Sequence, residues 1–206
     1  MAEVRTRFAA APQRLDALSD GVFAVVLTLL ALELRLPEAG IDDGFLAVLS
    51  ANAKVLESYI VSFYVVGVLW RLQHMVSDLT PRGTPFHYPL TLAFLAGVTL
   101  TPWSLDNLTS FPEDAAAVMS FSGILLVSWA LLIAMLSLAL KVPEAEAERG
   151  VQIRRTRMSL LGGPVTALLS IALAPIATSA ALYAWLLLLP WALLARRRQY
   201  TQTGNG

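Results

Sequence analysis

Long apolar runs dominate this chain, and its polar residues fall mainly between them. An apolar run of about 20 residues is long enough to cross the hydrocarbon core of a bilayer as a helix. The sequence contains six runs of roughly that length, at about Leu15–Leu36, Val55–His74, Tyr88–Leu105, Ala115–Leu140, Leu160–Thr178 and Ala180–Ala195. The pattern therefore predicts an all-α membrane protein with six transmembrane helices per chain.

The last two runs are the least regular. Gly162, Gly163 and Pro164 interrupt the fifth run near its start, and Pro190 interrupts the sixth. Such residues are tolerated in membrane helices when neighbouring groups satisfy the freed backbone. We therefore predict one transmembrane domain over residues 1–198, followed by a polar, disordered tail over residues 199–206.

Composition narrows the class of protein further. Of the 206 residues, 56% are hydrophobic and only 15% are charged, whereas soluble domains carry about 25% charged residues. This excludes a soluble globular domain and equally a disordered chain. The formal net charge is zero, which leaves no basic footprint for nucleic acid. The absence of cysteine excludes disulfides and thiolate chemistry.

The positive charges alternate from one loop to the next. Cytoplasmic loops of membrane proteins are enriched in Lys and Arg, and the alternation places both termini in the cytoplasm. The longest linker, residues 141–159, is expected to be a solvated cytoplasmic loop that touches anionic lipid. The cytoplasmic positive charges are Arg5, Arg7, Arg14, Arg71, Arg82, Lys141, Arg149, Arg154, Arg155, Arg157, Arg196, Arg197 and Arg198.

Motifs of known chemistry are missing from the sequence. It contains no G-x-x-x-x-G-K-[ST], no H-E-x-x-H, no G-x-S-x-G and no T-V-G-Y-G, so a P-loop, two hydrolase sites and the carbonyl-ring potassium filter are absent. The two histidines, His74 and His87, lie on different segments. We therefore expect no enzyme activity, no cofactor and no fixed metal site. Transport or conduction across the membrane becomes the leading class.

A carboxylate lies inside the first apolar run. Asp20 follows Arg14 by six residues, about 9 Å along a helix, and a charge at that depth is costly without a partner. The second run ends with Trp70 and His74 one turn apart, at a matching depth. We predict a polar cluster of Arg14, Ser19 and Asp20 with His74 and Trp70. The alternative is a set of unrelated interfacial residues.

An apolar stripe follows another face of the first run. At helical spacing Leu18, Val22, Val25, Leu29 and Leu32 line up. Asp20 projects roughly to the opposite side. Taken by itself, such a stripe is more often a lipid contact or a packing surface than the wall of a pore.

These residues resemble a known signature. Arg14-x-x-x-Leu18-Ser19-Asp20-Gly21 resembles the R-x-x-x-F-S-D-G motif of the transmembrane protein 175 family, the lysosomal potassium channels and their bacterial homologues. Ser62-Phe63 and Trp70-x-x-x-His74, together with the Leu100–Trp103 segment, extend the likeness over the first three runs. Two positions depart from the family pattern: Leu18 replaces Phe, and Gln73 stands where many members have a histidine.

The resemblance implies a potassium-preferring cation channel in the cell membrane, here a bacterial inner membrane. Family members of this size assemble as homotetramers in which the first helix of each subunit lines a central pore. By position, Val25, Thr28, Leu29 and Leu32 would form the apolar constriction and set selectivity, and Gly21 would join the polar cluster. Partners would be potassium and other monovalent cations, held only transiently, membrane lipid and identical subunits.

Two other functions stay open from the sequence. A proton-coupled secondary transporter could use Asp20 and His74 as a relay. An intramembrane enzyme could use the same two residues as an acid–base pair, although no nucleophile or metal set accompanies them.

Overall fold

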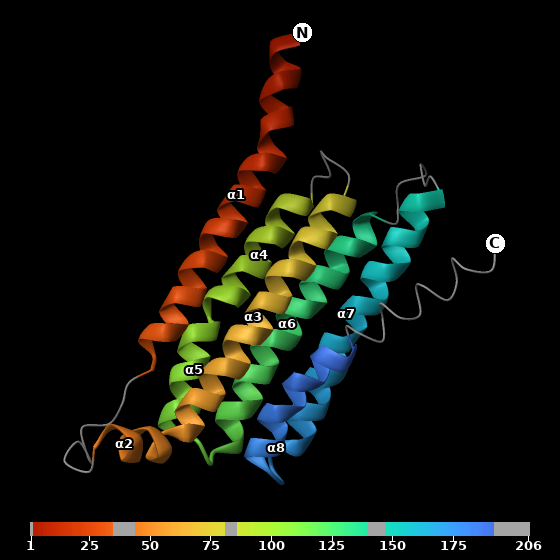
Figure 1. The fold of residues 1–206 in the computed structure, drawn as a ribbon. Coiled ribbons are helices and arrows are strands. Elements are labelled where there is room, and N and C mark those ends of the chain that lie inside the picture. Colours follow the sequence, from red (N-terminus) through yellow and green to blue (C-terminus); the bar gives the residue numbers. More distant parts are fainter. Residues whose placement is uncertain (1, 35–43, 81–85, 140–146, 192–206) are drawn as a thin grey trace.

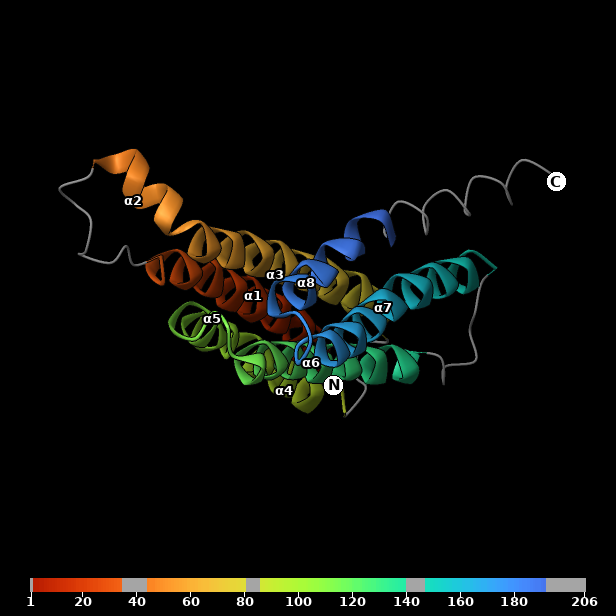
Figure 2. The same cartoon turned by 90° about the horizontal axis from the view of Figure 1, so that it is seen from below.

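The chain forms a bundle of antiparallel helices (Figures 1 and 2). In this computed structural model residues 2–34, 44–80, 86–139 and 147–191 are described, and within them all regular structure is helical. The chain crosses the bundle in alternating directions, and the final helices turn back along α7. The helices are α1 (Ala2–Leu32), α2 (Phe45–Ala51), α3 (Ala53–Leu79), α4 (His87–Thr99), α5 (Thr101–Ser110), α6 (Ala115–Ala139), α7 (Ala147–Leu173), α8 (Thr178–Tyr183) and the 3-10 turn η2 (Ala184–Leu187).

Four of these helices are long and apolar enough to cross a membrane. The qualifying segments are Arg14–Leu32, Ala53–Leu79, Ala115–Leu138 and Gly150–Leu173, and Thr178–Trp191 forms a shorter apolar segment. The remaining expected span, Tyr88–Leu105, is divided between α4 and α5 at Leu100. Pro102 explains the break, because its ring lacks an N–H and clashes with the carbonyl four residues earlier.

Helix boundaries differ from the sequence prediction at the amino ends of two helices. The predicted loop over 141–159 is wrong from Ala147 onward, where α7 begins. Its first turns are rich in Ala, Glu, Arg and Gln, all good helix formers. Likewise α1 begins at Ala2 and not near Leu15. Apolar runs mark where a helix is buried in lipid, and a helix with polar turns extends beyond them.

The ends of α1, α7 and the last helix also differ from the prediction. α1 ends at Leu32, short of the expected 36. α7 ends at Leu173. The next residue, Ala174, precedes Pro175, and a proline disfavours the helical conformation of the residue before it. The sixth expected span, 180–195, is helical over Thr178–Trp191, and its last four residues, like the expected tail over 199–206, lie outside the described residues.

Aromatic side chains fill the core on both sides of α6. Trp129 of α6 and Trp185 of η2 are completely buried, with ring centroids 5.7 Å apart. Gly163 of α7 accommodates Trp129, because a Cβ at this glycine would lie 2.0 Å from the Trp129 ring. On the other side of the bundle, Phe23 of α1 packs against Phe94 of α4 at 6.0 Å. The contact between Phe23 and Phe94 helps to orient α1, whose opposite face remains uncovered.

Candidate functional site

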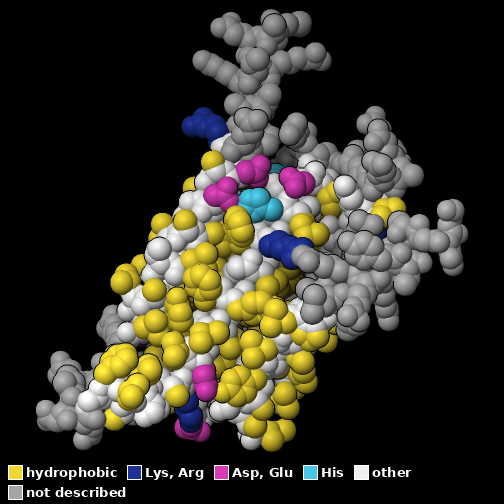
Figure 3. Space-filling model, viewed as in Figure 1, with side chains coloured by type: hydrophobic (Ala, Val, Ile, Leu, Met, Phe, Trp, Pro, Cys, Tyr) yellow, Lys and Arg dark blue, Asp and Glu magenta, His cyan; other side chains and the backbone are white. Residues whose placement is uncertain are grey.

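A polar cluster joins α1 to α3 near the end of the bundle that is drawn uppermost in Figure 1. The Trp70 indole N–H donates to Oδ1 of Asp20 at 3.0 Å, and Nε2 of His74 lies 3.1 Å from the same oxygen. Nδ1 of His74 lies 3.0 Å from the Trp70 carbonyl, so a doubly protonated ring would donate to both acceptors. Figure 3 shows acidic side chains gathered around a histidine at this end.

Three further side chains strengthen this junction. Gln73 donates to the Ser19 hydroxyl at 3.4 Å, and Ser19 donates to the carbonyl of Leu15. Ser77 donates to Asp16 at 2.6 Å. Sequence reasoning missed Gln73, Asp16 and Ser77. Gln73 and Ser77 lie on the same face of α3 as Trp70 and His74, and Asp16 lies one turn before Asp20 on α1. A helical projection therefore groups these side chains, whereas the pairs that they form depend on how α3 is rotated about its axis.

Two residues assigned to the cluster lie outside it. Arg14 is exposed and has no hydrogen bond or ion pair among the described residues. Gly21 is exposed, and no atom lies within 4 Å of the Cβ that another residue would carry there. Within one chain neither residue contributes to the junction between α1 and α3.

The predicted stripe on α1 is an uncovered apolar face. Val25 is 56% exposed, Leu29 39% and Leu32 69%. Val22 is only partly exposed and packs against the core, so the face is turned slightly away from it, towards Thr28. The opposite side of α1 is fully packed through Phe23, Val26 and Leu30.

Thr28 lies on this exposed face with its hydroxyl oriented. Its Oγ1 donates to the carbonyl of Val25 at 2.7 Å. Because the proton is directed into the helix, the oxygen lone pairs remain available on the outer side. The face therefore offers apolar side chains with one ordered oxygen acceptor among them.

His87, at the start of α4, lies close to the polar cluster. Burial lowers the pKa of His87 below its ordinary value, and the charge of Asp16 partly opposes that shift. Its Nδ1 is buried without a partner among the described residues. Since protonation is disfavoured, His87 adds a largely neutral ring at this end of the bundle.

Polar contacts at the opposite end of the bundle link α3 to α8 and to the segment before α6. Lys54 of α3 pairs with Glu113, and Tyr183 of α8 donates to Glu57 of α3 at 2.5 Å. Among the described residues no group of three or more His, Asp or Glu side chains could hold a metal ion. These contacts link segments far apart in the sequence and position α3 and α8.

The chain is similar in sequence to known ion channels. The family described as endosomal/lysosomal potassium channel TMEM175 matches residues 14–102. A potassium channel of Streptomyces collinus is 31% identical over 178 residues, covering 81% of this chain and 86% of that protein. The bovine endosomal/lysosomal proton channel TMEM175 is 31% identical over 113 residues, which are 50% of this chain and 24% of that protein.

A solved structure shares the fold. The crystal structure of a lysosomal potassium-selective channel TMEM175 homolog from Chamaesiphon minutus superposes with a TM-score of 0.77 at 24% identity, covering 90% of this chain and 98% of that one. These relatives are ion channels and not enzymes. With its apolar helices and its long match to the Streptomyces protein, the chain is a multi-pass membrane protein that belongs to the TMEM175 family of ion channels.

Proposed function

We propose that this chain forms a passive, potassium-preferring cation channel as a homotetramer. The first helix of each copy would line a central pore, and Val25, Thr28, Leu29 and Leu32 would form its constriction. The names of the Streptomyces and Chamaesiphon relatives, both potassium channels, support the choice of ion.

One observation carries this proposal: α1 leaves an apolar face uncovered while its other face is packed into the core. A lipid-facing helix could look the same. On α1, however, the uncovered face also carries Thr28 with an oriented hydroxyl, and Asp20 is anchored at its edge. Four copies of this face around an axis would enclose an apolar ring with oxygen acceptors beside it.

Selection in such a pore would rest on dehydration. A ring of Val25 side chains has no oxygen with which to replace water around an ion. Potassium gives up water more readily than sodium because its charge density is lower. Thr28 oxygens would offset part of that cost, so we expect a modest preference for potassium. A ring of Leu29 could close the pore by dewetting.

The same proposal fixes a topology. Six crossings arise when α4 and α5 act as one span and the segment from Thr178 completes the sixth. Residues 1–198 would then form one transmembrane domain with both termini in the cytoplasm, and lipid would surround the outer helices in a bacterial inner membrane. The alternation of positive charge supports this orientation.

Ion flux through the purified protein tests the function. Reconstituted into liposomes, the protein should carry potassium faster than sodium and exclude a large organic cation, without a gradient of a second ion. Equal flux of potassium and sodium would remove the selectivity claim. Loss of all flux without a second ion would remove the channel claim.

Two substitutions that shorten side chains test the constriction. Leu29→Ala and Val25→Ala should widen the pore and raise current. Leu92→Ala on α4 and Val127→Ala on α6 are matched controls, because these side chains are exposed to nearly the same extent, 38% and 57%. If all four variants conduct like the parent protein, the exposed face of α1 is not the constriction.

A proton-coupled function is the second candidate. The contact of His74 with Asp20 supports it, as does the bovine relative's name of proton channel. Potassium movement that appears only under a proton gradient, and that Asp20→Asn abolishes, would favour this function over passive conduction.

A further inference from the structure

A stripe on α7 changes from basic to apolar along its length. Arg154 and Arg157 are exposed at its beginning. Met158, Leu161, Val165 and Leu168 follow at helical spacing, and they are 43–58% exposed. Residues three and four apart share one face of a helix, so this "α7 stripe" is continuous.

Among the described residues, neither arginine of the stripe has an acidic partner. The ion pairs formed among the described residues are Lys54–Glu113 and His74–Asp20, and neither involves Arg154 or Arg157. A guanidinium group offers a planar set of donors that matches phosphate. Two unpaired arginines one turn apart are therefore suited to hold one phosphate between them.

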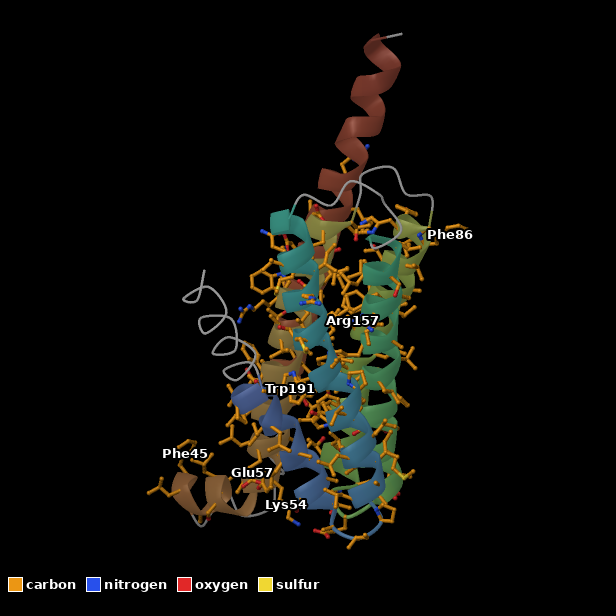
Figure 4. All side chains as sticks on the ribbon, turned by 90° about the vertical axis from the view of Figure 1, so that its right-hand side faces the viewer. Phe45, Lys54, Glu57, Phe86, Arg157 and Trp191 are labelled. Atoms are coloured by element: carbon orange, nitrogen blue, oxygen red, sulfur yellow. The ribbon has the colours of Figure 1, made fainter. Side chains whose placement is uncertain are left out.

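Trp191 forms a wall beside the stripe. Its indole N–H donates to the Met158 carbonyl at 3.0 Å. Gly162 makes room for the ring, because a Cβ there would lie 2.7 Å from Trp191 Cδ1. Figure 4 shows Arg157 and Trp191 on the same side of the molecule, with Trp191 further from the basic end. Trp191 thus contacts α7 where its exposed side chains change from basic to apolar, and tryptophan is enriched at the boundary between headgroups and hydrocarbon.

We propose that the α7 stripe binds an anionic phospholipid of the cytoplasmic leaflet. Arg154 and Arg157 hold the phosphate, Trp191 lies at the glycerol level, and an acyl chain lies along Leu161, Val165 and Leu168. Charge favours this occupant over a second copy of the chain, because a two-fold contact through the stripe would bring arginines against arginines. The site is independent of what the protein conducts.

Native mass spectrometry of the detergent-purified full chain tests the site, with phosphatidylglycerol and phosphatidylcholine as the lipids. The wild-type protein should retain phosphatidylglycerol preferentially. Each surface arginine is worth about 1 kcal/mol towards anionic lipid, which is about fivefold in affinity. Arg157→Gln should therefore weaken retention about fivefold, and Arg154→Gln/Arg157→Gln should weaken it further.

Arg71→Gln is the matched control, since Arg71 is an exposed arginine of α3 that lies outside the stripe. Equal losses in Arg71→Gln and Arg157→Gln would show a diffuse charge effect and overturn the site. An unchanged preference in the double variant would overturn it as well. The site would also be overturned if the double variant lost a dimeric species and kept its lipid, because the stripe would then bind a second copy of the chain.

Fluorescence quenching locates the lipid without depending on charge variants. Phosphatidylglycerol brominated on its acyl chains should quench part of the tryptophan emission, and Trp191→Phe should remove most of that quenched part. Brominated phosphatidylcholine should quench Trp191 less. Equal quenching by the two lipids, or quenching that Trp191→Phe leaves intact, would contradict the placement.

Discussion

Hydroxyl orientation decides what Thr28 can do on the uncovered face of α1. Its proton is committed to the Val25 carbonyl at 2.7 Å, so a passing ion would meet only oxygen lone pairs. Thr99 of α4 makes the same contact with its own helix, to the Ala96 carbonyl at 2.8 Å, and is also exposed. The two threonines differ in the helix that carries them, which makes them a natural pair for comparison.

Thr28→Val keeps the shape of the side chain and removes the oxygen. One hydrogen-bond-like contact is worth about 0.5–1.5 kcal/mol, so the potassium-to-sodium permeability ratio should fall about two- to twelvefold while current persists. Reversal potentials in mixed-ion solutions measure the ratio. Thr28→Ser should retain selectivity, and Thr99→Val should match the parent channel. A fall in Thr99→Val equal to that in Thr28→Val would contradict the role of Thr28.

Asp20 holds α1 against α3 and is directed towards that helix. Its carboxylate faces Trp70 and His74 of α3, so Asp20→Asn and His74→Ala should loosen the helix pair more than they change ion preference. We expect the free energy of unfolding to fall by about 1 kcal/mol for each variant, because the Asp20–His74 pair is about half exposed and is screened by solvent. Thermal melting of the assembled protein measures the loss, and Asp106→Asn on α5 is the control. A stable assembly with altered selectivity would place Asp20 in the ion path instead.

At the scale of single helices, hydropathy located most of the elements. The fourth predicted span, 115–140, matches α6, Ala115–Ala139, because an unbroken apolar run there is bounded by charged residues. The third span reads as one run, yet Pro102 divides it. The amino-terminal turns of α7 escaped prediction because they are polar, and hydropathy does not report helix propensity.

Depth and rotation explain which side chains of the polar cluster could be found in advance. Asp20, Trp70 and His74 share a depth that follows from counting residues along two antiparallel helices. The contacts of Gln73 with Ser19 and of Ser77 with Asp16 depend also on how α3 is rotated about its axis. That rotation is set by core packing between helices, which the sequence of one helix does not contain.

Gly163 is a site where helix packing rather than backbone freedom requires glycine. An added methyl group would lie 2.0 Å from the buried Trp129 ring, so Gly163→Ala should force α6 and α7 apart. Overpacking of this kind costs about 1–3 kcal/mol. Gly123→Ala on α6 is the control, since nothing lies within 4 Å of its Cβ position. The melting temperature should fall for Gly163→Ala only, and equal melting of the two variants would contradict the packing.

At the scale of the whole molecule, the helices of one chain leave α1 half covered. Helices α6 and α7 pack against each other and against the carboxyl-terminal segment, while α1 rests on α3, α4 and α5 along one side. An apolar surface as long as a membrane helix can face lipid or another copy of the chain. Gly21 distinguishes these cases, because it lies on the uncovered face and no described residue packs within 4 Å of its Cβ position.

Gly21→Leu should therefore leave the single chain folded and weaken the proposed four-copy assembly. A leucine at this position would meet no atom of the described part of its own chain near its Cβ, so we attribute an effect on assembly to a neighbouring copy. Circular dichroism reports the fold, and native mass spectrometry reports the number of chains. Gly123→Leu places the same side chain on the outer side of α6, also into open space, and should retain four chains. If Gly21→Leu assembles and conducts like Gly123→Leu, then α1 faces lipid and the pore lies elsewhere.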